Sequence, residues 1–370
     1  MNHVQIPSRI HHYDVYINAD FSPLTALLQD AKTVFVVDEQ LVTLYPALFA
    51  DIAPERILQL SAQEQHKDLF TVMRIYEFLL TFDAKRQLHL VSMGGGIIQD
   101  VTGFAACTLY RGIRWTFVPT TLLAQADSCV GSKTSLNFAD AKNSLGSFYP
   151  PQQIFICTDF LKSLPPVAID SGIGEIIKFL LLTDLEPPSL PKIKRLVEAV
   201  RNGDVVEAIY ETHLVKKSYI AQDEFDTGKR NLFNYGHCFG HALEASSHYA
   251  IAHGVAVTIG MWFANIISVM RGYLTPARHQ QLVAEFFAPN ISVVMAAEYL
   301  QPSAIIQALK RDKKRVSAQL TMILLVDDGF TASKKDDIDS TEVIEALAVL
   351  QLEWSQFITP CRHTDSAAIA

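Results

Sequence analysis

The sequence predicts an α/β domain with a parallel sheet, followed by a second domain that is mostly α-helical. Three observations lead to this prediction. Short β-branched runs alternate with longer helical patterns over the first part of the chain, strand-like runs become rare after Leu161, and two prolines in LKSLPP interrupt the pattern between the two regions. We therefore expect domains at residues 1–162 and 163–360, with residues 361–370 as a disordered tail.

The first domain is predicted from strand-length runs that end at turn residues. They are TVFVVD at 33–38, RILQLS at 56–61, HLVSM at 89–93, WTFVPT at 115–120 and QIFICTD at 153–159. Longer helical patterns such as KDLFTVMRIYEFLLTF lie between them. This alternation is typical of βαβ units, which place helices on both faces of a parallel sheet.

The second domain is predicted from long amphipathic patterns, for example LPKIKRLVEAVRNGDVVEAIYETHLVKKSYIAQD. Its most apolar stretch is GVAVTIGMWFANIISVM at 254–270. That stretch is shorter than the roughly 20 residues that a bilayer requires. We therefore expect a buried helix there, and no interaction with a membrane.

The composition is that of an ordinary globular protein, since 370 residues with 49% hydrophobic side chains can bury a large core. The formal net charge of −8 argues against nonspecific binding to nucleic acid. Five cysteines without paired spacing argue for a reducing compartment. The N-terminus MNHVQIPSRIHHYDVYI has no basic region followed by an apolar run, so we expect no signal peptide and a cytoplasmic location.

A glycine-rich turn indicates a possible nucleotide site. SMGGGIIQD places Gly94–Gly96 between a predicted strand and a predicted helix, where backbone amides can receive a pyrophosphate. A packing turn would give the same letters, and the spacing differs from GxGxxG. Asp38 ends the strand at 33–38, where an acidic residue either binds a ribose or caps a helix. Thr120 and Thr121 add two hydroxyls in a second strand-to-helix turn.

A histidine cluster indicates metal binding, proton transfer or both. NYGHCFGHALEASSHYAIAHG contains His237, His241 and His253. The first two are four residues apart, so on a helix they project from one face, and His253 begins the next apolar run. A core helix that carries hydrogen-bonded histidines is the simpler explanation for any one of them. Three imidazoles together favour a site.

Several charged residues occupy positions that a regular helix does not explain. ADSCVGSKTSLNFADAKNSLGSF contains Asp127, Lys133, Lys142 and Asn143, and its many Gly and Ser residues predict loops, on which sites are often built. SGIGEIIKF is a different case, because it places a carboxylate and an ammonium group, Glu175 and Lys178, on one helical face of an apolar segment. Either these two form an ion pair, or Glu175 supplies an oxygen ligand to a metal. Further along, Lys216, Arg230 and Asn234 precede the histidines in the segment KKSYIAQDEFDTGKRNLFNYGH. The basic run RDKKR at 311–315 is either solvated surface or part of the site.

These motifs give the chain a clear resemblance. It resembles 3-dehydroquinate synthases and the wider group of sugar-phosphate cyclases from about Asp38 to Lys314. The resemblance rests on MGGGIIQD, LYRGIRW, PTTLLAQADS, VGSKTSLN, KNSLGSFYPP, SGIGEIIK, RNLFNYGHCFGHALE, HGVAV and RDKK, in that order. It implies an N-terminal Rossmann-like NAD-binding domain, a C-terminal α-helical metal-binding domain, an active site between them and a homodimer.

The resemblance also implies individual roles. The ligands of Zn²⁺ or Co²⁺ would be Glu175, His237 and His253, with His241 handling protons beside them. Asp127 and Lys178 would lie at the reacting hydroxyls, while Lys216, Arg230 and Asn234 would hold the substrate carboxylate. The substrate phosphate would be bound by Lys133, Asn143, one of Lys313 and Lys314, and Arg111 reaching across the dimer interface. NAD would be held by Asp38, Glu64, Lys67, Gly94, Gly95, Gly96, Asp100, Thr120, Thr121 and Lys142.

The reaction implied is the NAD- and metal-dependent cyclisation of 3-deoxy-D-arabino-heptulosonate 7-phosphate to 3-dehydroquinate, a step toward the aromatic amino acids. Three segments differ from the usual family sequence: CVGSKT, NFADAKN and HGVAV. Because of these differences, a cyclase that acts on sedoheptulose 7-phosphate, glucose 6-phosphate or an amino analogue is the alternative. Lys216 and Arg230 favour the acid substrate, because those sugars have no carboxylate. A metal-dependent polyol dehydrogenase would not need the phosphate set. A non-catalytic binding protein is disfavoured because every proposed ligand position holds a competent residue.

Overall fold

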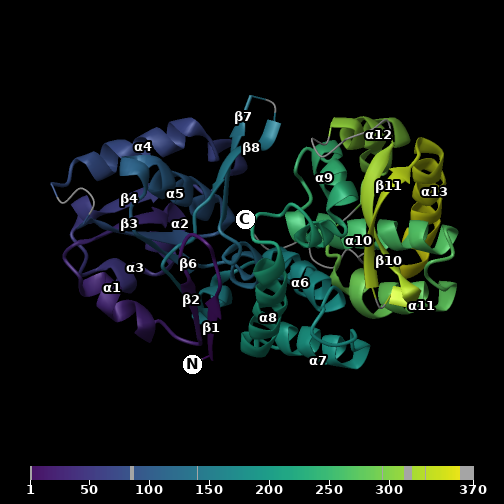
Figure 1. Ribbon diagram of the computed structural model, residues 1–370, viewed down its shortest axis with the longest axis horizontal. Helices are drawn as coiled ribbons and strands as arrows, with labels where there is room; N and C mark the ends of the chain where they lie inside the picture. Colours follow the sequence, from purple (N-terminus) through teal and green to yellow (C-terminus); the bar gives the residue numbers. More distant parts are fainter. Residues whose placement is uncertain are drawn as a thin grey trace, which may run out of the picture. The chain divides into compact units, whose positions relative to one another are not determined.

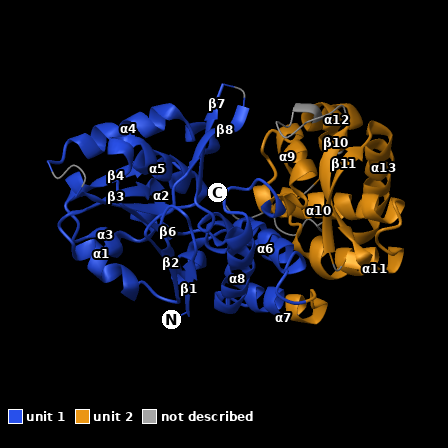
Figure 2. Cartoon of the chain, viewed as in Figure 1, with its two compact units in different colours: residues 1–186, 195–230 blue, residues 187–194, 231–370 orange. Residues whose placement is uncertain are grey.

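The computed structural model describes residues 2–83, 87–139, 141–293, 295–311, 319–329 and 331–358. The chain forms two compact units (Figure 2). Unit 1 contains residues 1–186 and 195–230, and unit 2 contains residues 187–194 and 231–370. Lys313, Lys314 and the predicted tail at 361–370 lie outside the described residues.

Unit 1 is built on a seven-stranded sheet with the order β1-β2-β9-β6-β5-β3-β4. Strands β1, β2, β3, β4 and β6 of this sheet are labelled in Figure 1. Its strands are β1 (Asn2–Ile6), β2 (Tyr13–Asn18), β3 (Thr33–Asp38), β4 (Ile57–Leu60), β5 (His89–Gly94), β6 (Trp115–Pro119) and β9 (Gln153–Cys157). The five strands predicted from β-branched runs are confirmed, and they pair in parallel. The sheet is nevertheless mixed, because β1 pairs with β2 antiparallel, and neither strand was predicted.

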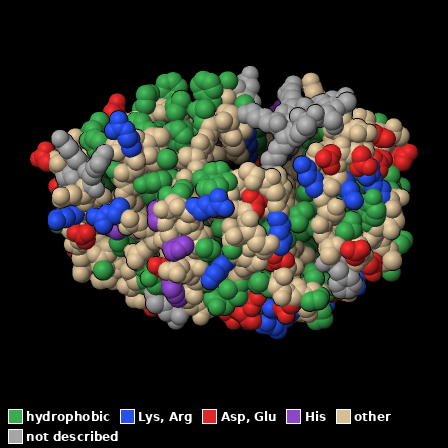
Figure 3. All heavy atoms as spheres, viewed as in Figure 1, with side chains coloured by type: hydrophobic (Ala, Val, Ile, Leu, Met, Phe, Trp, Pro, Cys, Tyr) green, Lys and Arg blue, Asp and Glu red, His purple; other side chains and the backbone are tan. Residues whose placement is uncertain are grey.

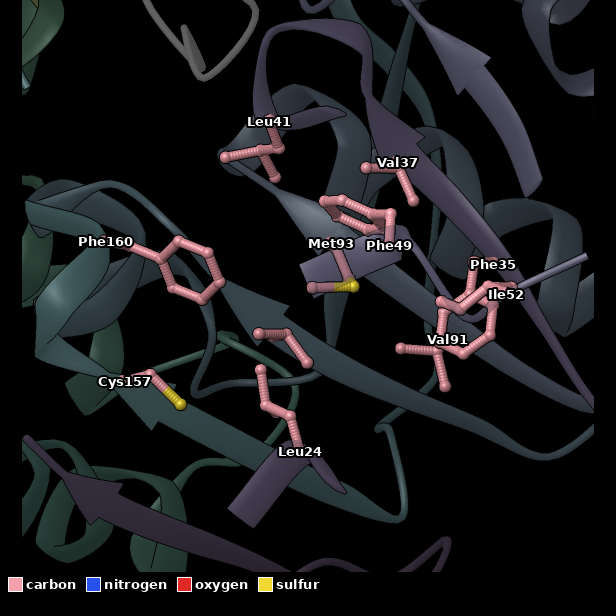
Figure 4. Packing of buried hydrophobic residues seen from close by; sticks show 11 residues of the cluster. Leu24, Phe35, Val37, Leu41, Phe49, Ile52, Val91, Met93, Cys157 and Phe160 are labelled. Atoms are coloured by element: carbon pink, nitrogen blue, oxygen red, sulfur yellow. The ribbon is translucent and has the colours of Figure 1, made fainter. Parts of the chain in front are cut away.

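Helices cover both faces of this sheet. On one face, Leu24, Leu41 and Phe49 pack against alternate residues of β3 and β5 in a buried cluster (Figure 4). The opposite face of β3, β5 and β6 packs against α5 (Gly96–Thr108), and α4 (Leu69–Leu80) packs beside α5. The alternation of inward and outward side chains along each strand produces the two layers.

The segment around Lys133 and Asn143 corrects a prediction. We expected loops there because of its Gly and Ser content, but residues 133–148 form an antiparallel hairpin of β7 (Lys133–Phe138) and β8 (Ala141–Phe148). The chain turns at Ala139, which has a φ of +51°. Small polar residues can pair across a two-stranded ribbon when α5 and α4 pack against one side of it.

The boundary between the units differs from the expected position at 162/163. Unit 1 also contains α6 (Pro166–Leu181) and α8 (Val206–Gln222), and it shares α7 (Leu190–Arg201) with unit 2. The composition does change after Leu161. However, α8 packs against β1 and β2, so this helical segment belongs with the sheet by contact.

Unit 2 is mostly helical, as predicted, with one two-stranded sheet. Its elements include α9 (His237–Ser246), α10 (His253–Met270), α11 (Pro276–Leu282), α12 (Pro302–Arg311), β10 (Leu320–Val326), β11 (Thr331–Ile338) and α13 (Ser340–Phe357). Helix α10 is the one helix among the described residues that is long and apolar enough to cross a membrane, but 83% of it is buried within the protein. It packs against α9, α13 and β10, which confirms the predicted buried helix.

Candidate active site

Predicted cofactor residues follow the carboxyl ends of neighbouring parallel strands in unit 1. Asp38 ends β3, Gly94 ends β5, and Thr120 and Thr121 follow β6. From β3 the chain passes to β4 on one side and then returns to β5 on the other side. The strand order therefore reverses between β3 and β5. Open α/β sheets bind nucleotides outside the strand ends at such a point.

The glycine turn serves packing and leaves room at its tip. A Cβ atom on Gly94 would lie 2.7 Å from the side chain of Ile98, so that glycine is required for the contact between β5 and α5. A Cβ atom on Gly96 would meet its nearest atom, the Ser128 Oγ, only at 3.6 Å. Gly96 is the first residue of α5, which presents its N-terminus at the strand ends. Asp38 caps α2 (Glu39–Leu44), since its Oδ1 accepts from the Gln40 amide at 3.1 Å.

A hydrogen-bonded network in unit 1 connects three predicted residues with Ser135, which was not predicted. The Lys67 Nζ donates to the Asp100 Oδ2 at 2.5 Å and to the Asn143 Oδ1 at 2.7 Å. The Ser135 Oγ lies 3.0 Å from the Asp100 Oδ2 and 3.0 Å from the Asn143 Oδ1, and its one proton can be donated to either. Burial raises the pKa of Asp100, and the Lys67 ammonium opposes that rise. Asn143, predicted to bind substrate phosphate, therefore directly contacts a lysine predicted to bind NAD.

Sequence reasoning missed Ser135 and Asn137 in this network. The Asn137 Nδ2 donates to the backbone and side-chain oxygens of Glu64, at 3.2 and 3.0 Å, and its Oδ1 accepts from the Asn143 amide at 2.9 Å. Lys142 lies 3.8 Å from the Glu64 carboxylate. Lys133, Ser135 and Asn137 alternate along β7, so the period of two in KTSLN was the signal that could have identified them.

A second cluster in unit 1 contains two lysines and two carboxylates. Asp127 lies in a π-helical turn at Ala124–Ser128, Glu175 and Lys178 lie on α6, and Lys216 lies on α8. Lys216 donates to the Asp127 side chain and backbone, and Lys178 pairs with Glu175. The Lys178 Nζ also lies 3.9 Å from the Asp127 Oδ2. The ion pair suggested by the spacing of Glu175 and Lys178 is therefore present.

Burial makes the charges of this cluster interdependent. Glu175, Lys178 and Lys216 are all at most 3% exposed. Both ammonium groups lie over the ring of Phe179, at 4.4 and 4.9 Å from its centroid. Burial alone would raise the pKa of Asp127, but the ammonium groups of Lys216 and Lys178 outweigh burial and hold that pKa below its usual value. Burial lowers the pKa of Lys216, and the Asp127 carboxylate opposes that shift. The cluster therefore places two lysine donors beside two carboxyl groups.

Arg230 lies close to this cluster and is buried. Its Nη1 donates to the Glu224 carbonyl at 2.6 Å and its Nη2 to the Gly131 carbonyl at 3.0 Å. Gly131 has a φ of +128°, and a Cβ atom there would lie 2.0 Å from the guanidinium. Only glycine therefore lets the chain pass this close to Arg230. Lys133 at the start of β7 pairs with Asp226 at 2.5 Å and is half exposed.

Unit 2 brings the three histidines together. His237 begins α9, His241 lies one turn further along it, and His253 begins α10. Their ring centroids are 5.3 to 5.7 Å apart, and one nitrogen from each ring lies within 4.8 Å of the others. These residues form the group among the described residues that could hold a metal ion.

The orientation of two rings fits metal binding. The His237 Nδ1 lies 3.2 Å from the Tyr235 carbonyl, which only accepts, so this nitrogen carries the proton. The His253 Nδ1 lies 3.3 Å from the carboxylate of Glu244, a buried residue. Each neutral ring then has its lone pair at Nε2, as in metal sites where a carbonyl or carboxylate fixes the tautomer.

Glycines allow the two histidine-bearing helices to approach closely. Gly236, just before α9, has a φ of +79°. A Cβ atom on Gly260 of α10 would lie 1.9 Å from the Gly236 carbonyl oxygen, and one on Gly240 would lie 3.1 Å from the Ala256 carbonyl oxygen. The backbones of α9 and α10 are therefore in contact, which brings His253 beside His237 and His241.

We expect Gly260→Ala to separate these helices and to weaken both the fold and metal binding. The added methyl group overlaps backbone and has no flexible side chain to displace, so the free energy of unfolding should fall by about 3 kcal/mol, the upper end for an overpacked core. Denaturant unfolding and metal titration measure the two effects. Gly240→Ala, with its longer contacts, should have the smaller effect, and equal effects would contradict this explanation.

The remaining predicted residues are Asn234, Arg111, Lys313 and Lys314. Asn234 lies in unit 2, where its Nδ2 donates to the Asn231 carbonyl at 2.8 Å. Arg111 is exposed in unit 1, on a turn after α5 where it has a φ of +64°. Lys313 and Lys314 lie in the segment that the structure does not describe.

Comparison with protein families gives two adjacent matches. A family model described as 3-dehydroquinate synthase N-terminal matches residues 57–171, and one described as 3-dehydroquinate synthase C-terminal matches residues 172–315. The 3-dehydroquinate synthase of Streptococcus equi subsp. equi is 33% identical over 337 residues, which cover 89% of this chain and 93% of that protein. The one of Dichelobacter nodosus is 35% identical, with 87% and 88% covered.

Solved structures share the fold. A 2-deoxy-scyllo-inosose synthase complexed with carbaglucose-6-phosphate, NAD⁺ and Co²⁺ is similar with a TM-score of 0.79 at 24% identity, over 94% of this chain and 99% of that one. The 2-epi-5-epi-valiolone synthase of Streptomyces hygroscopicus subsp. jinggangensis, with NAD⁺ and Zn²⁺ bound, has a TM-score of 0.80 at 22% identity, over 95% and 99%. Glycerol dehydrogenase of Schizosaccharomyces pombe reaches 0.60 at 16% identity, over 96% and 95%.

Proposed function

The chain belongs to the 3-dehydroquinate synthase family, and we propose that it converts 3-deoxy-D-arabino-heptulosonate 7-phosphate into 3-dehydroquinate and inorganic phosphate in the cytoplasm. Relatives with this name match nearly the whole chain. The structural observation that supports metal-dependent alcohol chemistry is the histidine cluster, in which the Nδ1 atoms of His237 and His253 are hydrogen-bonded and their Nε2 atoms can act as ligands.

The proposed metal ligands are Glu175, His237 and His253, with His241 as the neighbouring imidazole that handles protons. Two nitrogen donors and one carboxylate oxygen suit Zn²⁺ or Co²⁺ and leave a position for substrate. The proposed NAD site uses the switch point between β3 and β5 and the N-terminus of α5. When bound, the metal would polarise the C5 hydroxyl of the substrate, and NAD would accept a hydride there and later return it.

The residues of the chain itself hold the substrate and stabilise its charges. Lys178 pairs with Glu175 and Lys216 pairs with Asp127, and both lysines are proposed to donate to substrate oxygens. Arg230 with Lys216 and Asn234 is proposed to bind the carboxylate. Lys133, Asn143, one of Lys313 and Lys314, and Arg111 are proposed to bind the phosphate that leaves. Asn143 contacts Lys67, so the phosphate and NAD groups would meet at the β7–β8 hairpin.

Phosphate release tests the proposed substrate. The purified protein, with catalytic NAD⁺ and Zn²⁺ or Co²⁺, is incubated separately with the heptulosonate phosphate, sedoheptulose 7-phosphate and glucose 6-phosphate. We expect release only from the heptulosonate phosphate, without accumulation of NADH, because the hydride returns to the product. Release from a neutral sugar phosphate instead would reject the proposed substrate.

A cyclase of secondary metabolism is the second candidate. The solved structures of two such cyclases resemble this fold more closely than the glycerol dehydrogenase does, by TM-scores of 0.79 and 0.80 against 0.60. Activity with one of the two neutral sugar phosphates identifies this candidate. NADH that accumulates with a simple alcohol identifies a polyol dehydrogenase.

A homodimer in which Arg111 serves the partner's site is also proposed. Apolar side chains gather over α4 in Figure 3, and Phe70, Met73 and Leu80 of that helix are all exposed. Helix α4 lies next to the turn that carries Arg111, since the Tyr76 hydroxyl lies 2.5 Å from that of Thr108. An exposed apolar face beside an exposed arginine suits a subunit contact.

Mixed dimers are expected to regain activity if Arg111 acts across the interface. Arg111→Ala and His237→Ala should each be inactive alone, but after mixing and subunit exchange about a quarter of the wild-type activity should return, because half of the dimers then have one intact site. A mixture of Lys216→Met with His237→Ala, whose residues are proposed to act within one chain, should regain nothing. If the Arg111→Ala mixture also stays inactive, the proposal for Arg111 is wrong.

A further inference from the structure

The π-helical turn that carries Asp127 is held along one side by α8. Three successive carbonyl oxygens of the turn each accept a hydrogen bond from a side chain of this helix. The His213 Nε2 donates to the Gln125 carbonyl at 2.8 Å, and Lys216 donates to the Asp127 carbonyl. The Thr212 hydroxyl shares its one proton between the Ala126 carbonyl at 3.2 Å and the Ile209 carbonyl of its own helix at 2.8 Å. The three donors lie on one face of α8, because they are spaced by one, three and four residues.

We propose that Thr212 and His213 are positioning residues, which fix the π-helical turn and thereby the Asp127 carboxylate in the geometry that the reaction requires. This inference rests on the proposed function, since the role of Asp127 comes from it. Within the turn, Thr212 and His213 bond to backbone carbonyls and not to the Asp127 carboxylate, whereas Lys216 binds both the backbone and the carboxylate of Asp127. A shift of the turn would therefore change the Lys216–Asp127 pair.

The chemistry of His213 suits a fixed hydrogen-bond donor. The ring is completely buried, and burial together with the nearby Lys216 ammonium lowers the pKa of His213 to about 3. The ring is therefore neutral and carries one proton. The Gln125 carbonyl can only accept, so that proton resides on Nε2.

The neighbouring cysteine does not turn this histidine into a catalytic base. The Cys129 Sγ lies 3.7 Å from the His213 Nε2 and 3.4 Å from the Gln125 carbonyl oxygen. Burial raises the pKa of Cys129 to about 12, so it remains a thiol. The imidazole is neutral and already donates its proton to a carbonyl, so it does not act as a base for the thiol. Cys129 and His213 therefore have a structural role beside Asp127.

The other side of the turn is fixed independently. The Gln99 side chain of α5 donates to the Ser128 carbonyl at 2.7 Å, and it accepts from the Ser128 hydroxyl at 2.6 Å. The Gln125 side chain donates to the Pro119 and Cys157 carbonyls, at 3.1 and 3.0 Å. Loss of a donor on α8 should therefore tilt the turn rather than unfold it. A displacement of about 1 Å at a catalytic group can lower a rate on the order of 100-fold.

Paired substitutions separate positioning from packing. Thr212→Val and His213→Leu keep the volume approximately and remove the donor, whereas Thr212→Ser and His213→Gln keep a donor. We expect kcat to fall by about 10-fold in Thr212→Val and on the order of 100-fold in His213→Leu, with KM changed less than 3-fold, because the turn and not the binding groups is displaced. Thr212→Ser and His213→Gln should recover most of kcat.

Ser268→Ala is the matched control, because this buried hydroxyl on α10 also donates to a carbonyl, that of Ala264 at 3.0 Å. It should lose stability without losing kcat. The inference is overturned if Thr212→Val and His213→Leu lose no more kcat than Ser268→Ala does at the same stability. It is also overturned if Thr212→Ser and His213→Gln fail to recover kcat. Should His213→Leu not fold, the Thr212 pair decides the question alone.

Amide hydrogen exchange tests, without any substrate, whether Thr212 and His213 hold the π-helical turn. The amides of Cys129 and Val130 close the turn through bonds of 3.1 Å to the Ala124 and Asp127 carbonyls. Their exchange should accelerate at least about 10-fold in Thr212→Val and His213→Leu, and not in the paired variants. Unchanged exchange overturns the inference. If the wild-type protein releases no phosphate from any substrate while exchange behaves as expected, the proposed function fails. The positioning of the turn by Thr212 and His213 is then still supported.

Discussion

His253→Ala and His237→Ala are each expected to lose the bound metal and to lower kcat/KM on the order of 1,000-fold. A neighbouring oxygen fixes each ring at its Nδ1, so each substitution removes a nitrogen ligand that is already oriented. A metal that polarises a reacting oxygen contributes several kcal/mol to the stabilisation of the transition state. Metal content of the purified variants, measured beside phosphate release, checks both parts of the expectation.

The same series identifies the third ligand. If the proposed set is right, Glu175→Ala also loses metal, whereas His241→Ala retains it and loses activity. If Glu175→Ala retains metal and His241→Ala does not, the site is a three-imidazole site. Glu244→Gln should lower metal affinity by about 10- to 100-fold, as expected for a residue that orients a ligand. His248→Asn, at an exposed histidine just after α9, is the control and should change nothing.

Asp127→Asn is expected to abolish most activity and to lower the free energy of unfolding by about 3 kcal/mol near neutral pH. The substitution leaves two buried ammonium groups with one carboxylate, that of Glu175. The Asn side chain has almost the same volume, so lost packing does not explain the effect. Denaturant unfolding and phosphate release measure the two quantities.

The pH dependence of this loss has a definite sign. The pKa of Asp127 in the folded protein lies below its usual value of 3.8, because Lys216 and Lys178 outweigh the effect of burial. Its contribution to stability is therefore present above about pH 4, and it is lost as the pH falls through the lower folded pKa. The difference in stability between wild type and Asp127→Asn should shrink below pH 4. A difference that stays constant down to pH 2 would show that the ion pair is not its source.

Local sequence patterns predicted those parts of the fold that depend on neighbouring residues. The five β-branched runs became parallel strands, and the apolar stretch at 254–270 became a buried helix. His237 and His241 share a helix face because they are one turn apart. Gly94–Gly96 lies between β5 and α5, as its position between a strand pattern and a helix pattern indicated.

Long-range contacts decided what those patterns could not. Polar β7 and β8 became strands by pairing with each other and packing against α5. β1 and β2 are short alternating segments, and they belong to the sheet because β2 pairs with β9 and β1 pairs with β2. α6 and α8 belong to unit 1 because α8 packs against β1 and β2, although their composition resembles that of unit 2.

For the candidate site, local sequence identifies the available chemical groups: three histidines, Glu175 and Lys178 on one helical face, and a glycine turn between a strand and a helix. The orientation of these groups depends on contacts between distant parts of the chain. The Tyr235 carbonyl and the Glu244 carboxylate fix two imidazoles, and Gly236 and Gly260 let α9 and α10 come into contact. Thr212 and His213 fix the turn of Asp127 from about 85 residues away. The physical reason is that a side chain's identity and helical face are local properties, whereas the donor or acceptor that orients it comes from wherever the folded chain brings one.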